Sequence, residues 1–272
     1  MTSELIGASA LPEAAARTAA LLRTVQDPNL KVPGLTWNVG ETAAHMVADL
    51  ELYTGLITGE QEAGGHLDDD AAEAITPSQV TGSANAVQLA EFTERDPTRL
   101  ADRLVPAAGA FVAAAARHPA GEAVVATNGV PMTMPTMTAT LLGEQLIHGL
   151  DIARAANTPW RVTREDALLV IAGVMAMVPD YIDRAEAAGR HISYELRLRG
   201  GPRYRLTIDD GKAAVTEPGG RVDCRIVADP VGFLLVGYGR TGQLGQILRG
   251  KIIALGRKPW LGFAFGKLIT GP

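Results

Sequence analysis

The stretch Gly143-Glu-Gln-Leu-Ile-His-Gly-Leu-Asp151 is the most informative part of the chain. It lies within residues 137–156, whose apolar residues recur with the period of an amphipathic helix. Glu144 and His148 are four residues apart and Asp151 follows three residues later, so the three side chains share one helix face. Helical bundles build metal sites from carboxylates and imidazoles on inward faces. The same spacing also fits an exposed pair of polar residues, so the segment by itself leaves both interpretations open.

Three further helices are predicted upstream of this one. The four predicted helices span residues 11–25, 38–59, 84–118 and 137–156. Asn38 followed by Glu41 is the capping-box pattern of a helix start, and a break or bend is expected near Pro97. Residues 60–80 and 124–135 are polar or contain Gly and Pro, which is typical of connections. Four helices with two long connections favour a four-helix bundle.

His45 lies in the middle of the second predicted helix, among apolar neighbours. A single histidine in such a place is more often a core residue with a satisfied hydrogen bond than a metal ligand. Facing helices of a bundle can nevertheless bring His45 to Glu144 and His148. Two imidazoles and one carboxylate would leave one coordination position for a substrate atom or water, as in catalytic zinc sites.

The segment Asn157-Thr-Pro-Trp160 marks a boundary, so we expect domains at residues 1–160 and 161–272. The second domain is predicted to have strands at 194–198, 204–208, 213–216 and 222–227, and helices at 164–177, 230–236, 243–248 and 260–269. Asp210-Gly211 is a strong signal for a two-residue hairpin between two of these strands. We therefore expect a small antiparallel sheet with helices, and an α+β fold class for the whole chain.

Charge is distributed unevenly along the chain. Residues 230–272 contain six Lys or Arg and no Asp or Glu, which leaves 19 basic and 30 acidic residues, or −11, in the remainder. A basic segment can receive an anionic ligand, a lipid head group or nucleic acid, or it can be a solvated surface facing an acidic domain. Six charges spread over a Gly-rich apolar segment are a weak electrostatic footprint, so we expect no nucleic-acid partner.

The cysteine content and the apolar runs bear on location. Cys224 is the only cysteine, which excludes an internal disulfide and a cysteine-based zinc cluster and favours a reducing cytoplasm. Residues 1–25 lack the basic start and apolar core of a signal peptide. No apolar run approaches the roughly 20 residues that a membrane span requires. We expect a cytoplasmic protein without a membrane span.

Two segments resemble the mycothiol-dependent maleylpyruvate isomerase family, whose N-terminal domain is a DinB-like metal-binding bundle. They are Thr36-Trp-Asn-Val-Gly-Glu-Thr-Ala-Ala-His45 and the stretch from Gly143 to Asp151. The resemblance implies that His45, Glu144 and His148 bind a divalent metal, either zinc (Zn2+) or another divalent cation. Residues 196–268 resemble the sterol-carrier-protein-like domain that the same family appends to its bundle.

Two more residues are candidates for the chemistry of the site. Asp151 can orient His148 or a bound substrate, and it also fits a solvated helix carboxylate. Arg240 falls where the C-terminal domain of the resembled family presents an arginine toward the metal cleft, and an arginine there could hold a substrate carboxylate. A surface arginine is the alternative.

The resemblance implies a metal-dependent enzyme that activates a low-molecular-weight thiol, with mycothiol as the thiol cosubstrate and a small electrophile as the substrate. Isomerisation and S-transfer would both use an activated thiolate, and family membership does not fix the substrate. The alternative is a carrier protein whose C-terminal domain binds a lipid or another apolar ligand, with a structural or vestigial metal. Trp260, Phe263 and Phe265 fit either an apolar pocket or an ordinary core.

Overall fold

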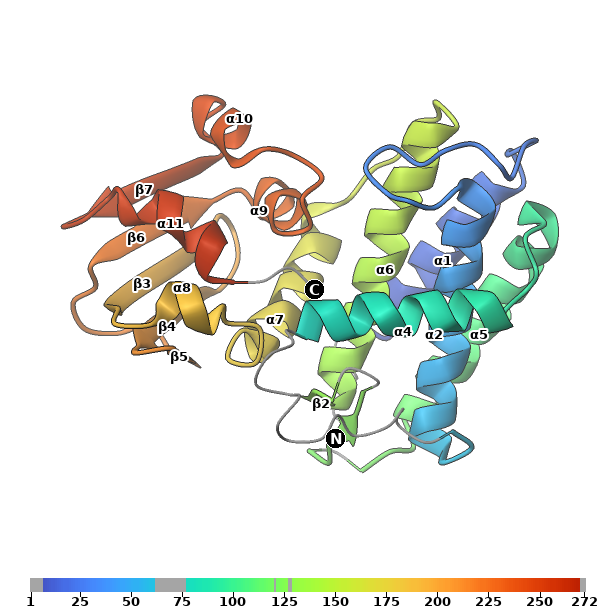
Figure 1. The fold of residues 1–272 in the computed structure, drawn as a ribbon, viewed down its shortest axis with the longest axis horizontal. Coiled ribbons are helices and arrows are strands. Elements are labelled where there is room, and N and C mark those ends of the chain that lie inside the picture. Colours follow the sequence, from blue (N-terminus) through green and yellow to red (C-terminus); the bar gives the residue numbers. More distant parts are fainter. Residues whose placement is uncertain (1–6, 62–76, 120, 127–128, 270–272) are drawn as a thin grey trace. The chain divides into compact units, whose positions relative to one another are not determined.

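A computed structural model describes residues 7–61, 77–119, 121–126 and 129–269. It divides into two compact units, with the main boundary between Gly173 and Val174 inside helix α7 (Arg164–Met177), and residues 77–79 are also grouped with the second unit. The first unit is mainly helical and the second combines a sheet with short helices (Figure 1). The predicted α+β fold class is therefore confirmed. The predicted domain boundary after residue 160 lies 13 residues before the division between the units and stays a prediction.

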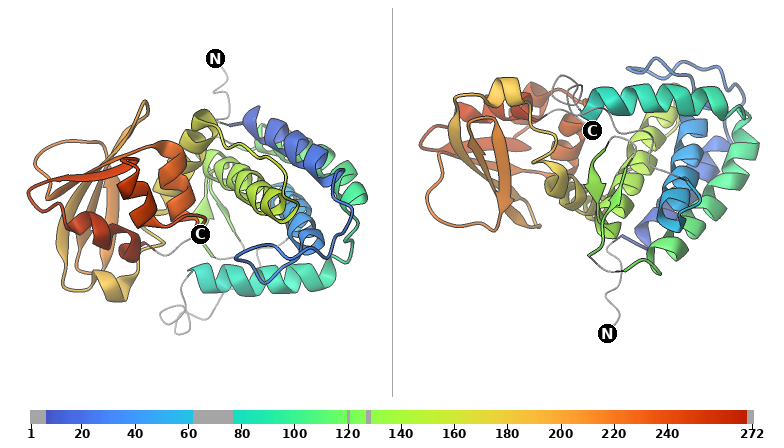
Figure 2. Two further views of the ribbon diagram at one scale, coloured as in Figure 1. Left: turned by 90° about the horizontal axis from the view of Figure 1, so that it is seen from above. Right: turned by 60° about the horizontal axis from the view of Figure 1, so that its bottom comes forward.

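The first unit is a four-helix bundle. Its helices are α1 (Ala10–Leu22), α2 (Val39–Thr58), α5 (Pro97–Ala115) and α6 (Met134–Ala155), and each packs against two of the others. An additional helix, α4 (Pro77–Glu91), runs across the bundle helices (Figures 1 and 2). The predicted helix 84–118 thus corresponds to α4 and α5. The break occurs at Pro97, which begins α5 because proline tolerates the first turn, with Asp96 accepting a hydrogen bond from the Arg99 N–H.

Local signals in the sequence set the starts of the two helices that carry the histidines. In α2 the Asn38 side chain accepts from the Glu41 N–H and the Glu41 side chain accepts from the Asn38 N–H, both at 2.8 Å, so the predicted capping box is confirmed. Helix α6 begins at Met134, earlier than the predicted residue 137, because Pro135 is compatible with a first turn. A short hairpin of β1 (Val124–Val125) and β2 (Pro131–Met132) precedes it and was not predicted.

Trp160 packs closely against α6 beside the most informative stretch of the sequence. Its indole N–H donates to the carbonyl of Leu146 over 3.0 Å. A Cβ atom added at Gly149 would lie 2.3 Å from the Trp160 ring, so only glycine permits this approach. The contact covers the backbone of α6 next to His148 and fixes the chain that leaves the helix.

The second unit contains a five-stranded sheet in the order β5-β4-β3-β6-β7. The strands are β3 (His191–Leu198), β4 (Arg203–Asp209), β5 (Lys212–Thr216), β6 (Cys224–Ala228) and β7 (Ile252–Gly256). Three of the four pairings are antiparallel, as expected, and β3 pairs with β6 in parallel. The parallel pairing and β7 were not predicted, because β7 is a short apolar run between glycines without a hairpin signal.

The helices of the second unit follow the prediction more closely. The predicted helices 230–236, 243–248 and 260–269 correspond to α9 (Pro230–Gly237), α10 (Gln243–Leu248) and α11 (Leu261–Leu268), whereas the short helix α8 (Arg184–Ala187) was not predicted. The predicted hairpin between β4 and β5 is confirmed, and both Asp210 and Gly211 have positive φ, at 44° and 79°. No helix in the described parts of the chain is long and apolar enough to cross a bilayer.

Candidate metal centre

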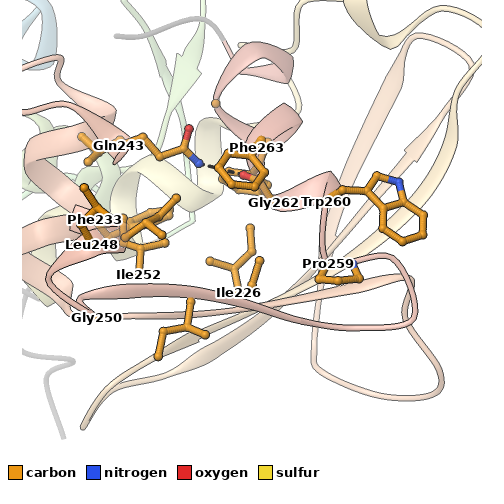
Figure 3. A pocket seen from close by; sticks show the side chains of 16 residues that line it. Ile226, Phe233, Gln243, Leu248, Gly250, Ile252, Pro259, Trp260, Gly262 and Phe263 are labelled. Carbon is orange, nitrogen blue, oxygen red and sulfur yellow. Dashed lines mark hydrogen bonds between the residues drawn. The ribbon is translucent and has the colours of Figure 1, made fainter. Parts of the chain in front are cut away.

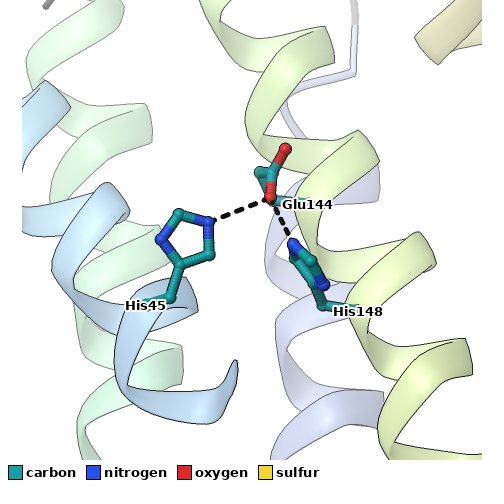
Figure 4. Close-up of side chains that lie close together, drawn as sticks. All are labelled: His45, Glu144 and His148. Atoms are coloured by element: carbon teal, nitrogen blue, oxygen red, sulfur yellow. Dashed lines mark hydrogen bonds and ion pairs between the residues drawn. The ribbon is translucent and has the colours of Figure 1, made fainter. Parts of the chain in front are cut away.

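Three side chains that are far apart in the sequence meet inside the bundle. His45 comes from α2, and Glu144 and His148 come from successive turns of α6 (Figure 4). The Oε2 atom of Glu144 lies 3.3 Å from Nε2 of His45 and 3.0 Å from Nε2 of His148. One ligand atom from each of the three residues lies within 4.8 Å of the other two. Both imidazoles are buried, whereas the carboxylate is partly exposed.

Two of the three separations in this group match those of a tetrahedral metal site. Ligand atoms about 2.1 Å from a zinc ion in tetrahedral geometry are separated by about 3.4 Å. The two observed nitrogen–oxygen separations, 3.3 and 3.0 Å, are close to this value. Among the described residues, His45, Glu144 and His148 form the one group of His, Cys, Asp or Glu side chains whose ligand atoms all lie within 4.8 Å of one another. Three protein ligands leave one position of a four-coordinate ion for a substrate atom or water.

Asp151 contacts the ring nitrogen of His148 that faces away from Glu144. Its Oδ2 atom lies 3.2 Å from Nδ1 of His148, and the residue is almost fully buried. A carboxylate only accepts hydrogen bonds, so Nδ1 carries the proton and Nε2 faces Glu144. Metal-ligating histidines commonly donate their second N–H to a carboxylate in this way.

His45 has an equivalent support that the sequence did not reveal. Nδ1 of His45 lies 3.0 Å from Oε1 of Gln88 in α4. An amide oxygen only accepts hydrogen bonds, so Nδ1–H is the donor. The amide group of Gln88 in turn donates to Oδ1 of Asp49 over 2.8 Å. The other oxygen of Asp49 lies 3.4 Å from Nε2 of His45, four residues earlier in the same helix. The two imidazoles therefore have the same orientation, each with Nδ1 on its supporting acceptor and Nε2 toward Glu144.

The electrostatics of the centre favour positive charge. Burial lowers the pKa of His45, but the carboxylates of Asp49 and Glu144 outweigh it and raise that pKa to about 9. Burial likewise lowers the pKa of His148, and Asp151 with Glu144 produces a net rise. Burial raises the pKa of Glu144, but hydrogen bonds and charge from the two histidines bring it well below its usual value. The protons on the two Nε2 atoms occupy the sides of the rings where a divalent cation would be coordinated.

Trp37 forms an aromatic wall beside both imidazoles. Its ring centroid lies 4.9 Å from that of His45 and 6.0 Å from that of His148. Trp37 is only partly buried and immediately precedes the capping residue Asn38. The cap of α2 therefore fixes both the start of the helix and the ring that borders the centre.

Comparison with known proteins agrees with this geometry. The family model described as the mycothiol maleylpyruvate isomerase N-terminal domain matches residues 11–153, which include all three candidate ligands. The chain belongs to this family. No curated protein matches the chain.

Solved structures of the same kind show the same fold. A crystal structure of the mycothiol-dependent maleylpyruvate isomerase is 13% identical, covers 92% of each chain and has a TM-score of 0.55. A crystal structure of a mutant of that enzyme, with one histidine replaced by alanine, is 14% identical, again covers 92% of each chain and has a TM-score of 0.54. At this identity the likeness establishes the fold, and the specific activity of this member of the maleylpyruvate isomerase family stays a proposal.

Arg240 belongs to the second unit, three residues after the end of α9. Its guanidinium donates to the carbonyl of Tyr238 over 2.7 Å. Its predicted contact with a substrate carboxylate stays a prediction. The roles of His45, Glu144, His148 and Asp151 at a metal also stay predictions, although the structure brings these four residues together.

The second unit of this maleylpyruvate isomerase family member also contains an apolar hollow of about 620 Å³. It is bordered by β7, α9, α10 and α11, and Phe233, Ile252 and Phe263 are among its lining residues (Figure 3). Trp260 and Phe263, which the sequence left open between pocket and core, both line it and are exposed. Phe265 lines it as well but is buried and packs against Tyr194, so it also serves the core.

Proposed function

We propose that this protein is a metal-dependent enzyme that activates a low-molecular-weight thiol for reaction with a small electrophile. The convergence of His45, Glu144 and His148, in a domain of the maleylpyruvate isomerase family, is the observation that supports this most directly. By family membership the thiol is mycothiol, and the reaction is isomerisation or S-transfer. A cytoplasmic location is part of the proposal, because a free thiol cosubstrate persists where thiols are kept reduced.

The residues of the bundle have separate tasks in this proposal. His45, Glu144 and His148 hold the cation, and two nitrogen donors with one carboxylate suit zinc while admitting other divalent metals. When bound, such a cation lowers the pKa of a coordinated thiol and so supplies thiolate near neutral pH. Gln88 and Asp151 accept from Nδ1 of the two histidines, which directs each Nε2 inward as the nitrogen that would bind the cation once its proton is displaced.

The proposed isomerisation leaves the thiol unchanged. The thiolate sulfur forms a bond to one carbon of a double bond conjugated with a carbonyl, and the π electrons move onto the carbonyl oxygen. The resulting single bond rotates, the electrons return, and the carbon–sulfur bond breaks to release the thiolate. In S-transfer the carbon–sulfur bond remains and a leaving group departs with its electron pair. Arg240 holds a carboxylate of the substrate in this proposal.

Metal analysis and a thiol assay test the proposal together. Purified protein reconstituted with zinc is expected to hold about one metal ion per chain, and the His148→Ala variant is expected to lose it. Turnover of a panel of conjugated and alkylating electrophiles is expected to require both mycothiol and metal, and to stop when a chelator is added. Metal-free wild-type protein after reconstitution, or turnover that is indifferent to the chelator, contradicts the proposal.

The apolar hollow supports a second candidate function, the binding of an apolar ligand in the second unit. Its walls are almost entirely aliphatic and aromatic, which is typical of sites for apolar small molecules. Organic extraction of the purified protein, followed by mass spectrometry, tests it. A stoichiometric co-purifying lipid in a protein without thiol-dependent turnover favours the carrier function, whereas an empty protein with such turnover favours the enzyme.

A further inference from the structure

Exposed apolar side chains are concentrated in one part of the second unit. Of the nine large hydrophobic side chains that are exposed among the described residues, six lie between residues 244 and 263. We name these six residues the apolar rim: Leu244, Leu248, Ile253, Leu255, Trp260 and Phe263. Leu248 is 80% exposed, and Trp260 and Phe263 are 62% and 58% exposed. Contiguous exposed apolar side chains on a soluble protein mark a surface that interacts with something.

Four of the six residues of the apolar rim line the hollow, namely Leu248, Ile253, Trp260 and Phe263. Leu248, Trp260 and Phe263 lie at different places around its edge, on or next to α10 and α11, and Trp260 points away from the hollow (Figure 3). Ile253 alternates along β7 with Ile252 and Ala254, so its exposed side chain and that of Leu255 project from the other face of the sheet. The same surface therefore combines a concave apolar centre with protruding apolar side chains at its margin.

The segment that carries the apolar rim is basic. Residues 230–272 contain no Asp or Glu. Two of the neighbouring lysines have acidic partners outside this segment, Lys251 at 3.9 Å from Asp229 and Lys258 at 3.1 Å from Asp223. The exposed residues Arg249, Arg257 and Lys267 have no acidic partner among the described residues. This surface therefore favours a partner whose own surface is negatively charged and whose interior is apolar.

A second copy of the chain does not meet this condition. An isologous dimer through the apolar rim would place the same patch on both sides of the interface. Arg249, Arg257 and Lys267 of one copy would then face the equivalent cations of the other, and repulsion would oppose association. An anionic lipid surface has the complementary charge and an apolar interior directly beneath it.

We propose that the apolar rim docks on the surface of an anionic lipid bilayer. Trp260, Phe263 and Leu248 enter the boundary between head groups and acyl chains, where the amphipathic indole of tryptophan is favoured. Arg249, Arg257 and Lys267 lie at the level of the anionic head groups. The protein binds peripherally and reversibly, because a few apolar side chains and cations supply far less membrane affinity than a spanning helix. This docking is independent of the metal centre.

Vesicle co-sedimentation of the full-length, zinc-treated protein tests the proposal. Retention on vesicles containing about a third phosphatidylglycerol is expected to exceed retention on pure phosphatidylcholine by about tenfold or more, because each nearby cation strengthens binding to an anionic surface. High salt is expected to reduce retention, since it screens these charges. The Leu248→Glu/Phe263→Glu double variant is expected to lose retention. Val105→Glu, which adds a charge at an exposed apolar position of α5, is the matched control and is expected to bind as wild type.

Tryptophan fluorescence gives a second readout of the same contact. Trp260 is strongly exposed, whereas Trp37 and Trp160 are partly buried in the bundle. A blue shift on adding anionic vesicles is expected in wild type and absent in Trp260→Phe, which keeps an apolar ring and should still co-sediment. Equal retention on neutral and anionic vesicles, equal loss in Val105→Glu, or a vesicle-free dimer that Phe263→Glu dissociates would overturn the proposal. The circular dichroism spectrum of each variant establishes that it is folded.

Discussion

The side-chain oxygen of Gln88 lies 3.0 Å from Nδ1 of His45, and this contact connects α4 to the candidate metal centre. The same amide group donates to Asp49 through its nitrogen, so one side chain sets both the orientation of a candidate ligand and the place of a buried carboxylate. The contact makes α4, which runs across the bundle, part of the centre.

Replacing Gln88 by leucine is expected to weaken zinc binding by about 10- to 100-fold, because the ring of His45 loses the acceptor that orients it. Competition with a chromogenic chelator measures the dissociation constant. Val87→Leu is the control, since Val87 is the exposed neighbour of Gln88 on the same helix. Equal zinc affinity in Gln88→Leu and wild type would show that Gln88 does not support the centre.

Asp151→Asn is expected to weaken zinc binding by about tenfold while leaving one metal ion per chain at saturation. Asparagine keeps the size of the side chain but makes His148 a poorer donor ligand, because a neutral amide accepts from Nδ1–H less strongly than a carboxylate. His148→Ala, by contrast, is expected to abolish stoichiometric binding. Saturation titrations of the two variants distinguish these outcomes, and an unchanged affinity in Asp151→Asn would contradict the role assigned to Asp151.

In metal-free protein the titration of His45 is expected to couple to stability. The folded-state pKa, about 9, lies above the usual 6.5. A raised folded-state pKa means that the folded protein binds the proton more tightly, so this stabilisation is complete below about pH 6.5 and is lost as the pH rises through about 9. The free energy of unfolding, measured with urea at pH 6.5 and 9.5, is expected to fall more in wild type than in His45→Gln. Identical pH dependence in the two proteins would show that His45 is not held in its charged form.

Gly149→Ala is expected to destabilise the first unit by about 1–3 kcal/mol, because the added Cβ would overlap the Trp160 ring and force it to move. Urea unfolding measures the loss, and the fluorescence of the folded protein reports the displaced indole. Gly109→Ala is the matched control, since Gly109 lies within α5 with nothing within 4 Å of an added Cβ. There the same substitution is expected to stabilise by about 0.4–1 kcal/mol. Similar effects at both positions would argue against a tight contact at Gly149.

Periodicity and local motifs predicted the bundle and the capping of α2, because both depend on residues close together in the chain. The meeting of Glu144 with His148 follows from one helical turn, whereas the packing of a bundle left the approach of His45 open and the family resemblance implied it. The contact of Asp49 with His45 could have been predicted in the same way, since Asp49 lies one helical turn after His45.

Other features could not be predicted in this way. Gln88 lies on a helix without a recognisable motif, and its contact with His45 depends entirely on how α4 crosses the bundle. The parallel pairing of β3 with β6 joins strands that no tight turn connects, so no local signal encodes it. The contact of Trp160 with Gly149 likewise depends on the path of the chain after α6.

Helix α6 makes specific contacts on more than one face. Glu144 and His148 lie against His45, while Gly149 leaves room for the indole of Trp160. Inserting or deleting a single residue between Glu144 and Gly149 would rotate everything downstream by about 100° and separate these partners at once. Changes of chain length in this family should therefore be confined to the connections between helices, and the spacing within this part of α6 should be far less variable than its individual residues.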